Sequence, residues 1–240
     1  RLVSFIGSSA YKVTISTFHS FCNDIIQDNL SLFDKTSLDP ISELEKIELL
    51  KKLIDGFEKN NPLKRYRGDV YFEMSNLAKL FSAMKKEGWT SQYLIERIDA
   101  YIQEIPFRDE FIYKRKYKQF EAGALKQGLV DVELEKMSKL KAAVNCFDIY
   151  QELMKSHNRY DFDDMINWVL KAFNENKNLL AQYQERYLYI LVDEFQDTSG
   201  TQNALIKLLV NYWEQPNLFV VGDDDQSIFR FQGANVENML

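Results

Sequence analysis

Two short apolar runs in the last third of the chain constrain its fold more than any other feature. Residues 188–192 read Leu-Tyr-Ile-Leu-Val and residues 217–221 read Asn-Leu-Phe-Val-Val. Continuous apolar runs of this length are typical of strands that are buried on both faces of a parallel sheet. A stripe at helical spacing, from Leu205 to Tyr212, lies between them. Strand, helix and strand in this order predict a βαβ unit and therefore an α/β fold.

A third strand is expected near the beginning of the chain. Residues 12–17, Lys-Val-Thr-Ile-Ser-Thr, are rich in β-branched side chains, and a helix-like run follows from Phe18 to about Asn29. A long stretch of helical character separates this segment from the two later strands. The arrangement predicts one parallel sheet that is interrupted by a large helical insertion.

Residues 31–158 have helical periodicity nearly throughout. Asp39-Pro40 resembles an N-cap followed by proline at the first helical position, and Gly56 and Gly88 are typical stop signals. Apolar residues recur every three or four positions in four stripes: Leu44, Ile47, Leu50 and Ile54; Met74, Leu77, Leu80, Phe81 and Met84; Tyr113, Tyr117, Phe120 and Ala124; and Leu134, Met137, Leu140, Val144, Phe147 and Met154.

Composition excludes several classes of protein. A chain of 240 residues that is 45% hydrophobic can bury a sizeable core, and 4 prolines and 9 glycines argue against disorder. No apolar run approaches the roughly 18 residues of a membrane span, and the first residues carry no export signal. Two cysteines, Cys22 and Cys146, form no disulfide framework, so we expect a reducing, cytoplasmic compartment and a buried Cys22. A net charge of −6 excludes a uniformly basic nucleic-acid coat but allows a local basic groove.

Both predicted strands of the βαβ unit end in acidic residues. Asp193 and Glu194 follow the first strand, and three aspartates and then Gln226 follow the second. Ligands bind at the carboxyl ends of strands in open α/β sheets. In nucleotide hydrolysis one carboxylate can hold Mg²⁺ and a second can activate water, while an amide can sense the terminal phosphate. For the Asp-Glu pair taken alone, a solvated acidic turn with Asp197 or Thr198 as the next N-cap is the simpler alternative.

Aromatic and basic residues occur together in three places. Phe229 and Phe231 flank an arginine, a pattern that suits stacking on single-stranded bases, with two core phenylalanines as the alternative. Residues 64–67 and 113–118 are basic runs with interleaved tyrosines, a pattern that would suit contact with nucleic-acid phosphates. For the second run the favoured interpretation is that the aromatic side chains share one helical face and pack inward while the lysines are solvated.

Four segments together resemble the UvrD/Rep-type superfamily-one helicases. Residues 190–198 (ILVDEFQDT) resemble the Walker B segment of that family, residues 221–229 (VGDDDQSIF) its motif III, residues 15–21 (ISTFHSF) its motif Ib, and residues 160–165 (YDFDDM) the stretch that follows its helical insertion. The segments occur in the order and spacing of the family. The resemblance implies a partial RecA-like (P-loop NTPase) parallel sheet with an all-helical insertion domain, within an ATP-dependent DNA helicase.

The resemblance also implies roles for individual residues. Asp193 would be the magnesium-associated carboxylate and Glu194 the general base, while Gln226 would contact the γ-phosphate region and couple it to the DNA site. The residues implied for the DNA path are Thr17, Phe18, His19, Phe229 and Phe231. The implied ligands are ATP, Mg²⁺, and single-stranded and duplex DNA, with translocation from 3′ to 5′ and no membrane partner.

The sequence departs from the family pattern at three points. Gln232 stands where arginine is usual, and Phe229 stands where tyrosine is usual. The phosphate-cradling G-x-x-x-x-G-K-[ST] loop does not occur in the sequence. We therefore expect an internal fragment, inactive alone, with residues 1–30 and 159–240 as part of the first RecA-like domain and residues 31–158 as its insertion. A sheet without its phosphate-loop strand would have an unpaired apolar edge.

Two further questions remain open at the level of the sequence. A non-hydrolysing nucleic-acid-binding or partner-docking module, or part of a helicase–nuclease, is the alternative to a helicase motor. For Asp161, Asp163 and Asp164, capping of a helix that runs to about Asn174 is favoured over metal binding.

Overall fold

The computed structural model describes residues 2–33 and 39–223, which divide into two compact units. Unit 1 contains residues 2–33 and 161–223, and unit 2 contains residues 39–160. Each unit has its own buried core. The described residues are mostly helical, with short parallel strands in each unit, which is consistent with a partial α/β domain.

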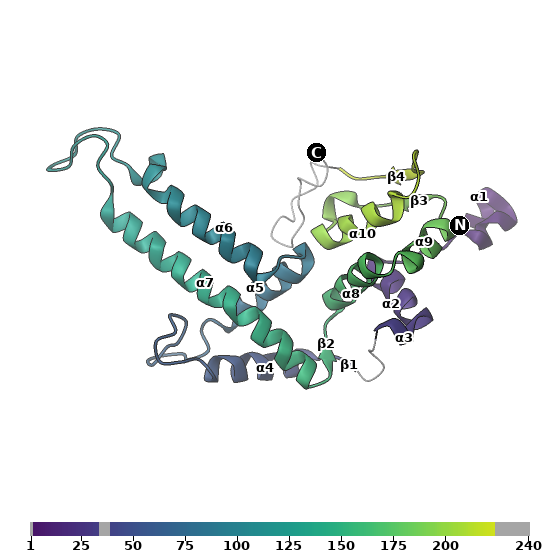
Figure 1. Ribbon diagram of the computed structural model, residues 1–240, viewed down its shortest axis with the longest axis horizontal. Helices are drawn as coiled ribbons and strands as arrows, with labels where there is room; N and C mark the ends of the chain where they lie inside the picture. Colours follow the sequence, from purple (N-terminus) through teal and green to yellow (C-terminus); the bar gives the residue numbers. More distant parts are fainter. Residues whose placement is uncertain (1, 34–38, 224–240) are drawn as a thin grey trace. The chain divides into compact units, whose positions relative to one another are not determined.

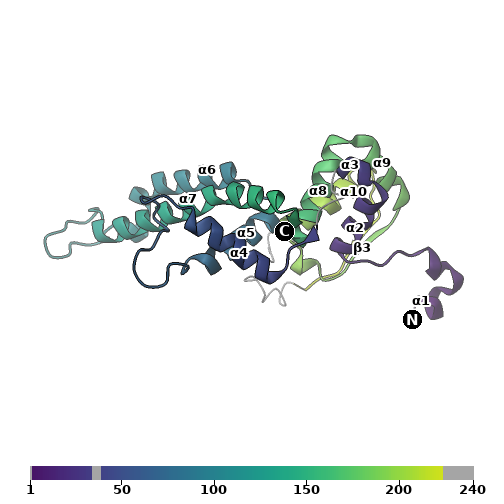
Figure 2. The same cartoon turned by 90° about the horizontal axis from the view of Figure 1, so that it is seen from below.

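Unit 2 is a helical assembly (Figures 1 and 2). Its elements are β1 (Asp39–Pro40), α4 (Glu43–Asp55), α5 (Met74–Glu87), α6 (Ser91–Glu104), the 3₁₀ turns η2 (Ile105–Phe107) and η3 (Asp109–Phe111), α7 (Gln127–Ser156) and β2 (Arg159–Tyr160). The long helices α6 and α7 lie side by side, and an extended loop connects their far ends. Gly88 ends α5 in the left-handed conformation, with φ of 67°, as its stop signal predicts.

The core of unit 2 is formed by apolar faces of α4, α5 and α7, as the periodicity predicts. Its largest buried side chains include Phe81 and Tyr150, whose rings stack with centroids 5.0 Å apart. Each such buried side chain contributes about 1.5–3 kcal/mol to the free energy of unfolding. The predicted stripe on α4 is only partly right, because Leu44 and Ile47 are exposed and the buried residues lie in the second half of the helix.

The predicted start of the first insertion helix is wrong. Asp39 and Pro40 do not cap α4 but form β1, which pairs in parallel with β2. Ser42 caps α4 instead, in a capping box with Glu45. The long-range pairing with Arg159 and Tyr160 therefore prevails over the local Asp-Pro signal.

Hydrogen bonds join the first and the last residues of unit 2, and we call this connection the neck. The guanidinium of Arg159 donates to Glu45 Oε1 at 2.7 Å and contacts Asp39 Oδ2 at 3.4 Å. The backbone N–H of Ile41 donates to the carbonyl of Tyr160 at 2.8 Å. This neck cluster (Asp39, Glu45 and Arg159) ties together two segments that are far apart in the sequence.

Unit 1 contains the predicted βαβ unit (Figure 1). Its elements are α1 (Leu2–Ile6), η1 (Gly7–Lys12), α2 (Phe18–Asp28), α3 (Leu30–Phe33), α8 (Phe162–Glu175), α9 (Lys177–Arg186), β3 (Ile190–Val192), η4 (Phe195–Asp197), α10 (Gly200–Val210) and β4 (Leu218–Val220). Strands β3 and β4 are parallel, with Leu191 opposite Phe219, and α10 connects them. The strand–helix–strand prediction is confirmed.

The core of unit 1 lies among its helices. Buried apolar residues of α2, α8, α9 and α10 pack together, and they include Cys22, Ile25, Val169, Phe173, Tyr183 and Leu205. Cys22 is completely buried, and burial raises the pKa of its thiol to about 12. Cys22 is therefore a small apolar core residue, as expected.

Two strand predictions for unit 1 are wrong. Residues 13–17 form no strand, and Ile15 is 76% exposed. The apolar strands are not buried on both faces, because Leu191 is 74% exposed and Phe219 is 64% exposed. In both cases a β-prone segment has no further strand or helix to cover it among the described residues. Within residues 2–33 and 39–223, no helix combines the length and apolar character that crossing a bilayer requires.

The neck cluster generates a prediction about acid stability. Hydrogen bonds from the backbone and hydroxyl of Ser42 and from Arg159 lower the pKa of Glu45 from 4.5 to about 2. A carboxyl with a lowered folded-state pKa stabilises the fold above its unfolded pKa and loses this contribution as the pH falls. We expect the midpoint temperature of thermal unfolding to decrease as the pH is lowered from 4.5 to about 2. Glu45→Gln should make this decrease smaller. Circular dichroism melts would contradict this if both proteins showed the same pH dependence.

The exposed strands generate a prediction about self-association. Leu191 and Phe219 lie opposite each other in the β3–β4 sheet and form an exposed apolar surface, and such surfaces favour contacts between molecules. We expect Leu191→Lys combined with Phe219→Lys to shift the isolated chain towards monomer in sedimentation velocity experiments. The matched control is Leu44→Lys, at an exposed position on α4, which should leave the distribution unchanged.

Candidate functional site

The backbone turns sharply where β3 ends. Asp193 and Glu194 follow β3 directly, and both side chains are exposed. Glu194 adopts the left-handed conformation, with φ of 51°, which is uncommon for a residue with a Cβ atom. The turn continues as η4, in which the N–H of Asp197 donates to the carbonyl of Glu194 at 2.9 Å. The turn thus presents two adjacent carboxylates at the carboxyl edge of the strand.

Backbone hydrogen bonds hold this turn against the end of β4. The N–H of Val221 donates to the carbonyl of Val192 at 2.8 Å, and the N–H of Phe195 donates to the carbonyl of Val221 at 2.9 Å. The ladder therefore skips Asp193 and Glu194 and resumes at Phe195. Because of this skip, the two acidic residues lie outside the sheet while their neighbours are fixed within it.

One buried side chain connects the two strand ends. Gln196 in η4 is only 3% exposed. Its amide Nε2 donates to Glu194 Oε2 at 2.5 Å, and its Oε1 accepts from the N–H of Asp223 at 3.2 Å. Sequence reasoning missed this residue, since nothing in its position two residues after Glu194 shows that it is buried.

The structure brings together only some of the predicted site residues. Asp193 and Glu194 lie at the end of β3, beside the segment that follows β4. Gln226, Phe229 and Phe231 lie outside the described residues, so their predicted roles stay predictions. Among the described residues no group of three or more His, Cys, Asp or Glu side chains is placed to hold a metal ion.

The predicted DNA-path residues of the first segment lie at the start of α2. Thr17 is the N-cap, and its hydroxyl oxygen accepts from the N–H of Ser20 at 3.1 Å. The ring of His19 contacts Phe162 edge to face, with centroids 6.1 Å apart, and its Nε2 lies 3.8 Å from Asp163 Oδ1. The segment that resembles motif Ib and the start of α8 are therefore neighbours in unit 1.

The aspartates at the start of α8 have a structural role. Asp161 is the N-cap of α8 and forms a capping box with Asp164, each side chain accepting from the backbone N–H of the other residue. Capping was the favoured interpretation for Asp161, Asp163 and Asp164, and it is confirmed for Asp161 and Asp164. The expectation that Asp197 or Thr198 is the N-cap of the next helix is wrong. Ser199 caps α10 instead, in a capping box with Gln202.

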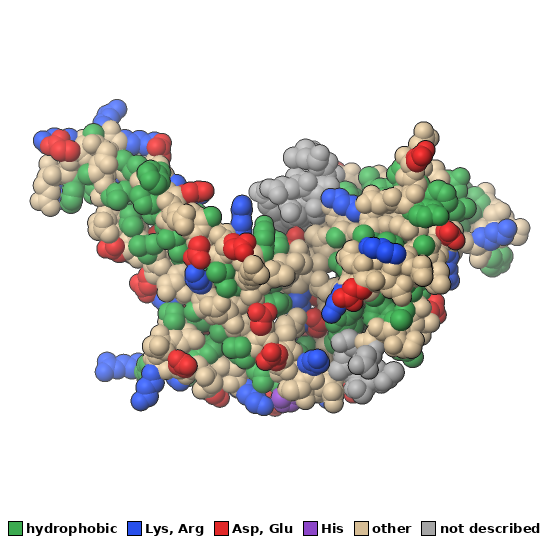
Figure 3. All heavy atoms as spheres, in the orientation of Figure 1, with side chains coloured by type: hydrophobic (Ala, Val, Ile, Leu, Met, Phe, Trp, Pro, Cys, Tyr) green, Lys and Arg blue, Asp and Glu red, His purple; other side chains and the backbone are tan. Residues whose placement is uncertain are grey.

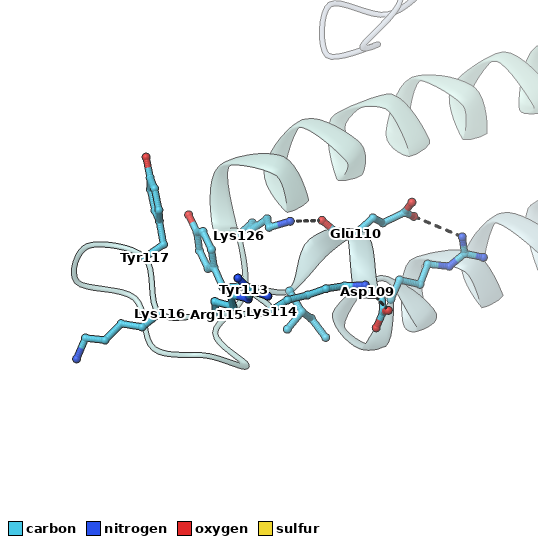
Figure 4. Close-up of a pocket in the computed structure, with 10 residues that line it drawn as sticks. Asp109, Glu110, Tyr113, Lys114, Arg115, Lys116, Tyr117 and Lys126 are labelled. Carbon is cyan, nitrogen blue, oxygen red and sulfur yellow. Dashed lines mark hydrogen bonds and ion pairs between the residues drawn. The ribbon is translucent and has the colours of Figure 1, made fainter.

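The second basic run lies in the loop between η3 and α7 of unit 2, and it is not a helix (Figure 4). Antiparallel bridges join Ile112 to Leu125 and Tyr117 to Phe120. The ring of Tyr113 stacks on the rings of Tyr117 and Phe120, with centroids 5.9 and 5.1 Å away. The predicted helical stripe is wrong, because the regular aromatic spacing reflects stacking within a loop. Tyr117 is exposed, so it does not pack inward either.

The same loop borders an open cavity of about 1050 Å³, lined by residues of both charges. Lys114 pairs with Asp109 at 2.8 Å, and Arg108 pairs with Glu104 at 3.1 Å. Lys116 pairs with Glu121. Figure 3 shows basic and acidic side chains together at this end of unit 2. Much of the positive charge of this run is therefore neutralised locally, and phosphate contact here stays a hypothesis.

Comparisons with known proteins point to one family. The sequence profile of the UvrD/REP helicase N-terminal domain matches residues 1–240. The probable DNA helicase II homolog of Mycoplasma genitalium is 30% identical over 246 residues, which cover 98% of this chain and 28% of that protein. The ATP-dependent DNA helicase PcrA of Bacillus subtilis is 27% identical over 243 residues, which cover 100% of this chain and 26% of that protein.

A shorter match has higher identity. The putative ATP-dependent DNA helicase YjcD of Bacillus subtilis is 42% identical over 100 residues, which cover 42% of this chain and 13% of that protein. The chain thus spans about a quarter of the length of the relatives that match it from end to end.

Proposed function

Because the chain belongs to the UvrD/REP helicase family, we propose that it is part of an ATP-dependent DNA helicase. In this proposal, hydrolysis of ATP drives movement along single-stranded DNA, from 3′ to 5′, and separation of the duplex. Unit 1 is part of a RecA-like domain and unit 2 is its helical insertion. The buried, unpaired cysteines suit a cytoplasmic enzyme.

The observation that carries the proposal is the turn after β3. Its two adjacent carboxylates are exposed, while the backbone on either side is fixed to the end of β4. Phosphoryl transfer needs positioning and electrostatic stabilisation more than covalent chemistry from the protein. A rigid turn that presents acids at a strand end supplies the positioning.

Asp193 suits the role of a magnesium-associated carboxylate. Mg²⁺ in nucleotide sites is commonly held by one or two carboxylates together with phosphates and water, so a cage of three protein ligands is not required. Asp193 is exposed, and its Oδ1 accepts from the N–H of Glu194 at 3.0 Å, which fixes the direction of the carboxylate. Bound Mg²⁺ would neutralise charge on the phosphates of ATP.

Glu194 suits the role of a general base. Its Oε2 is engaged by Gln196, so its Oε1 remains available to accept a hydrogen bond from a water molecule. In hydrolysis Glu194 would orient that water and accept its proton as the water attacks the γ-phosphate. Gln226 would contact the same phosphate, and Thr17, Phe18, His19, Phe229 and Phe231 would line the DNA path.

The decisive experiment uses the full-length protein that contains this chain. We expect Glu194→Gln to lower the DNA-stimulated ATPase rate about 100-fold or more, because the amide cannot accept the proton, while ATP still binds. Steady-state ATPase assays and titration with a fluorescent ATP analogue measure the two effects. The matched control is Glu48→Gln on α4, an exposed glutamate, which should retain wild-type turnover. Unimpaired turnover of Glu194→Gln would remove Glu194 from this role.

A second prediction concerns the 240-residue chain alone. Its sequence contains no G-x-x-x-x-G-K-[ST] loop to cradle the phosphates, so we expect negligible ATPase activity and weak nucleotide binding. Equilibrium titration with ATP and Mg²⁺ tests this directly. Low-micromolar affinity for ATP would show that this chain binds phosphates by other means.

A further inference from the structure

Gln196 occupies an unusual position for a neutral polar side chain. It is almost completely buried, yet both ends of its amide group are used. One end reaches the carboxylate of Glu194 after β3, and the other reaches the backbone N–H of Asp223 after β4. A single side chain thus joins the two strand ends at which the proposed chemistry takes place.

The two partners fix the orientation of the amide. A carboxylate can only accept a hydrogen bond, so it must face the NH₂ group of Gln196. A backbone N–H can only donate, so it must face the carbonyl oxygen. Neither an ionised glutamate nor a methionine at this position could satisfy both partners. Glutamine supplies a donor and an acceptor on one amide group, and its side chain is long enough to reach both partners.

Gly222 provides the space that Gln196 needs. A Cβ atom on residue 222 would lie 2.7 Å from Gln196 Oε1 and 3.2 Å from its backbone nitrogen. Both distances are shorter than ordinary van der Waals contacts. The glycine is therefore required by close approach of the two strand ends, not by its backbone conformation.

The backbone around Gln196 is also held firmly. The N–H of Thr198 donates to the carbonyl of Phe195 at 3.1 Å, and its hydroxyl donates to the same oxygen at 2.7 Å. These hydrogen bonds close the turn from which Gln196 projects and restrain its backbone.

We propose that Gln196 is a positioning residue that links the Glu194 carboxylate to the backbone of Asp223, so that the base after β3 is held in a fixed position relative to the end of β4. The inference rests on the proposed role of Glu194 in ATP hydrolysis. Glu194 then has its productive orientation only while the hydrogen bonds of Gln196 to Glu194 and to Asp223 are both formed.

Three variants of the full-length protein test the link from different sides. Gln196→Met removes both hydrogen bonds with little change in size, and Gln196→Glu keeps an acceptor for Asp223 but places a carboxylate against Glu194. Gly222→Ala displaces the glutamine without altering it. We expect each to lower kcat for DNA-stimulated ATPase about 10- to 100-fold, as for loss of a hydrogen bond to a charged group, with KM for ATP changed by less than about threefold.

The double variant with Glu194→Gln separates positioning from general structural damage. If Gln196 acts through Glu194, adding Gln196→Met to Glu194→Gln should cause no further loss of kcat. If Gln196→Met damages the structure independently of Glu194, the double variant should have a lower kcat than Glu194→Gln alone. Gly128→Ala is the matched glycine control, because no atom lies within 4 Å of its added Cβ, and it should retain wild-type kcat.

The outcomes distinguish this inference from the proposed function. If Glu194→Gln abolishes turnover while Gln196→Met and Gly222→Ala retain wild-type kcat, the link is overturned and the proposed function stands. If Glu194→Gln retains turnover, the role proposed for Glu194 as general base fails, and the basis of the link fails with it. If Gln196→Met does not fold, Gly222→Ala and Gln196→Glu decide the matter, and wild-type kcat in both would overturn the link.

Discussion

The parallel ladder between β3 and β4 is the constraint on which the candidate site depends. Its hydrogen bonds continue past the strands, from Val221 to Val192 and from Phe195 to Val221, and they skip the two acidic residues between. Within the skipped segment Glu194 adopts the left-handed conformation, and both carboxylates are exposed beside the end of β4. Backbone geometry, rather than attraction between charges, therefore places the acids, and Gln196 completes the arrangement with one amide.

Unit 2 illustrates why basic runs are weak indicators of binding surfaces. The second run contains four cations within six residues, yet neighbouring acids pair with two of them and the aromatic residues stack on one another. Surface ion pairs of this kind contribute little to stability, but they reduce the field that a phosphate would encounter. The neck cluster uses charge differently, since Arg159 joins residues more than a hundred positions away and closes the unit at its base.

The family match and the structure describe different aspects of this protein. The family match covers the whole chain and accounts for the order of its segments, whereas the relatives are several times longer than the chain. The structure adds how the acidic turn is built and which neighbours restrain it. The structure also shows that β3 and β4 form a two-stranded sheet with exposed apolar side chains, on which further secondary structure could pack.

The features that depend on local interactions could be predicted from the sequence. Helices α2, α5, α7 and α8 follow from apolar periodicity and from caps such as Asp161 and Gly88, and the βαβ unit follows from two apolar runs around a helix. The remaining features depend on contacts between segments that are distant in the sequence. Residues 13–17 form no strand because a strand needs a partner, and Asp39-Pro40 pairs with a segment that no local signal reveals. Burial of Gln196 likewise arises only when two strand ends meet, because hydrogen bonds between distant residues are set by the packed fold and not by sequence spacing.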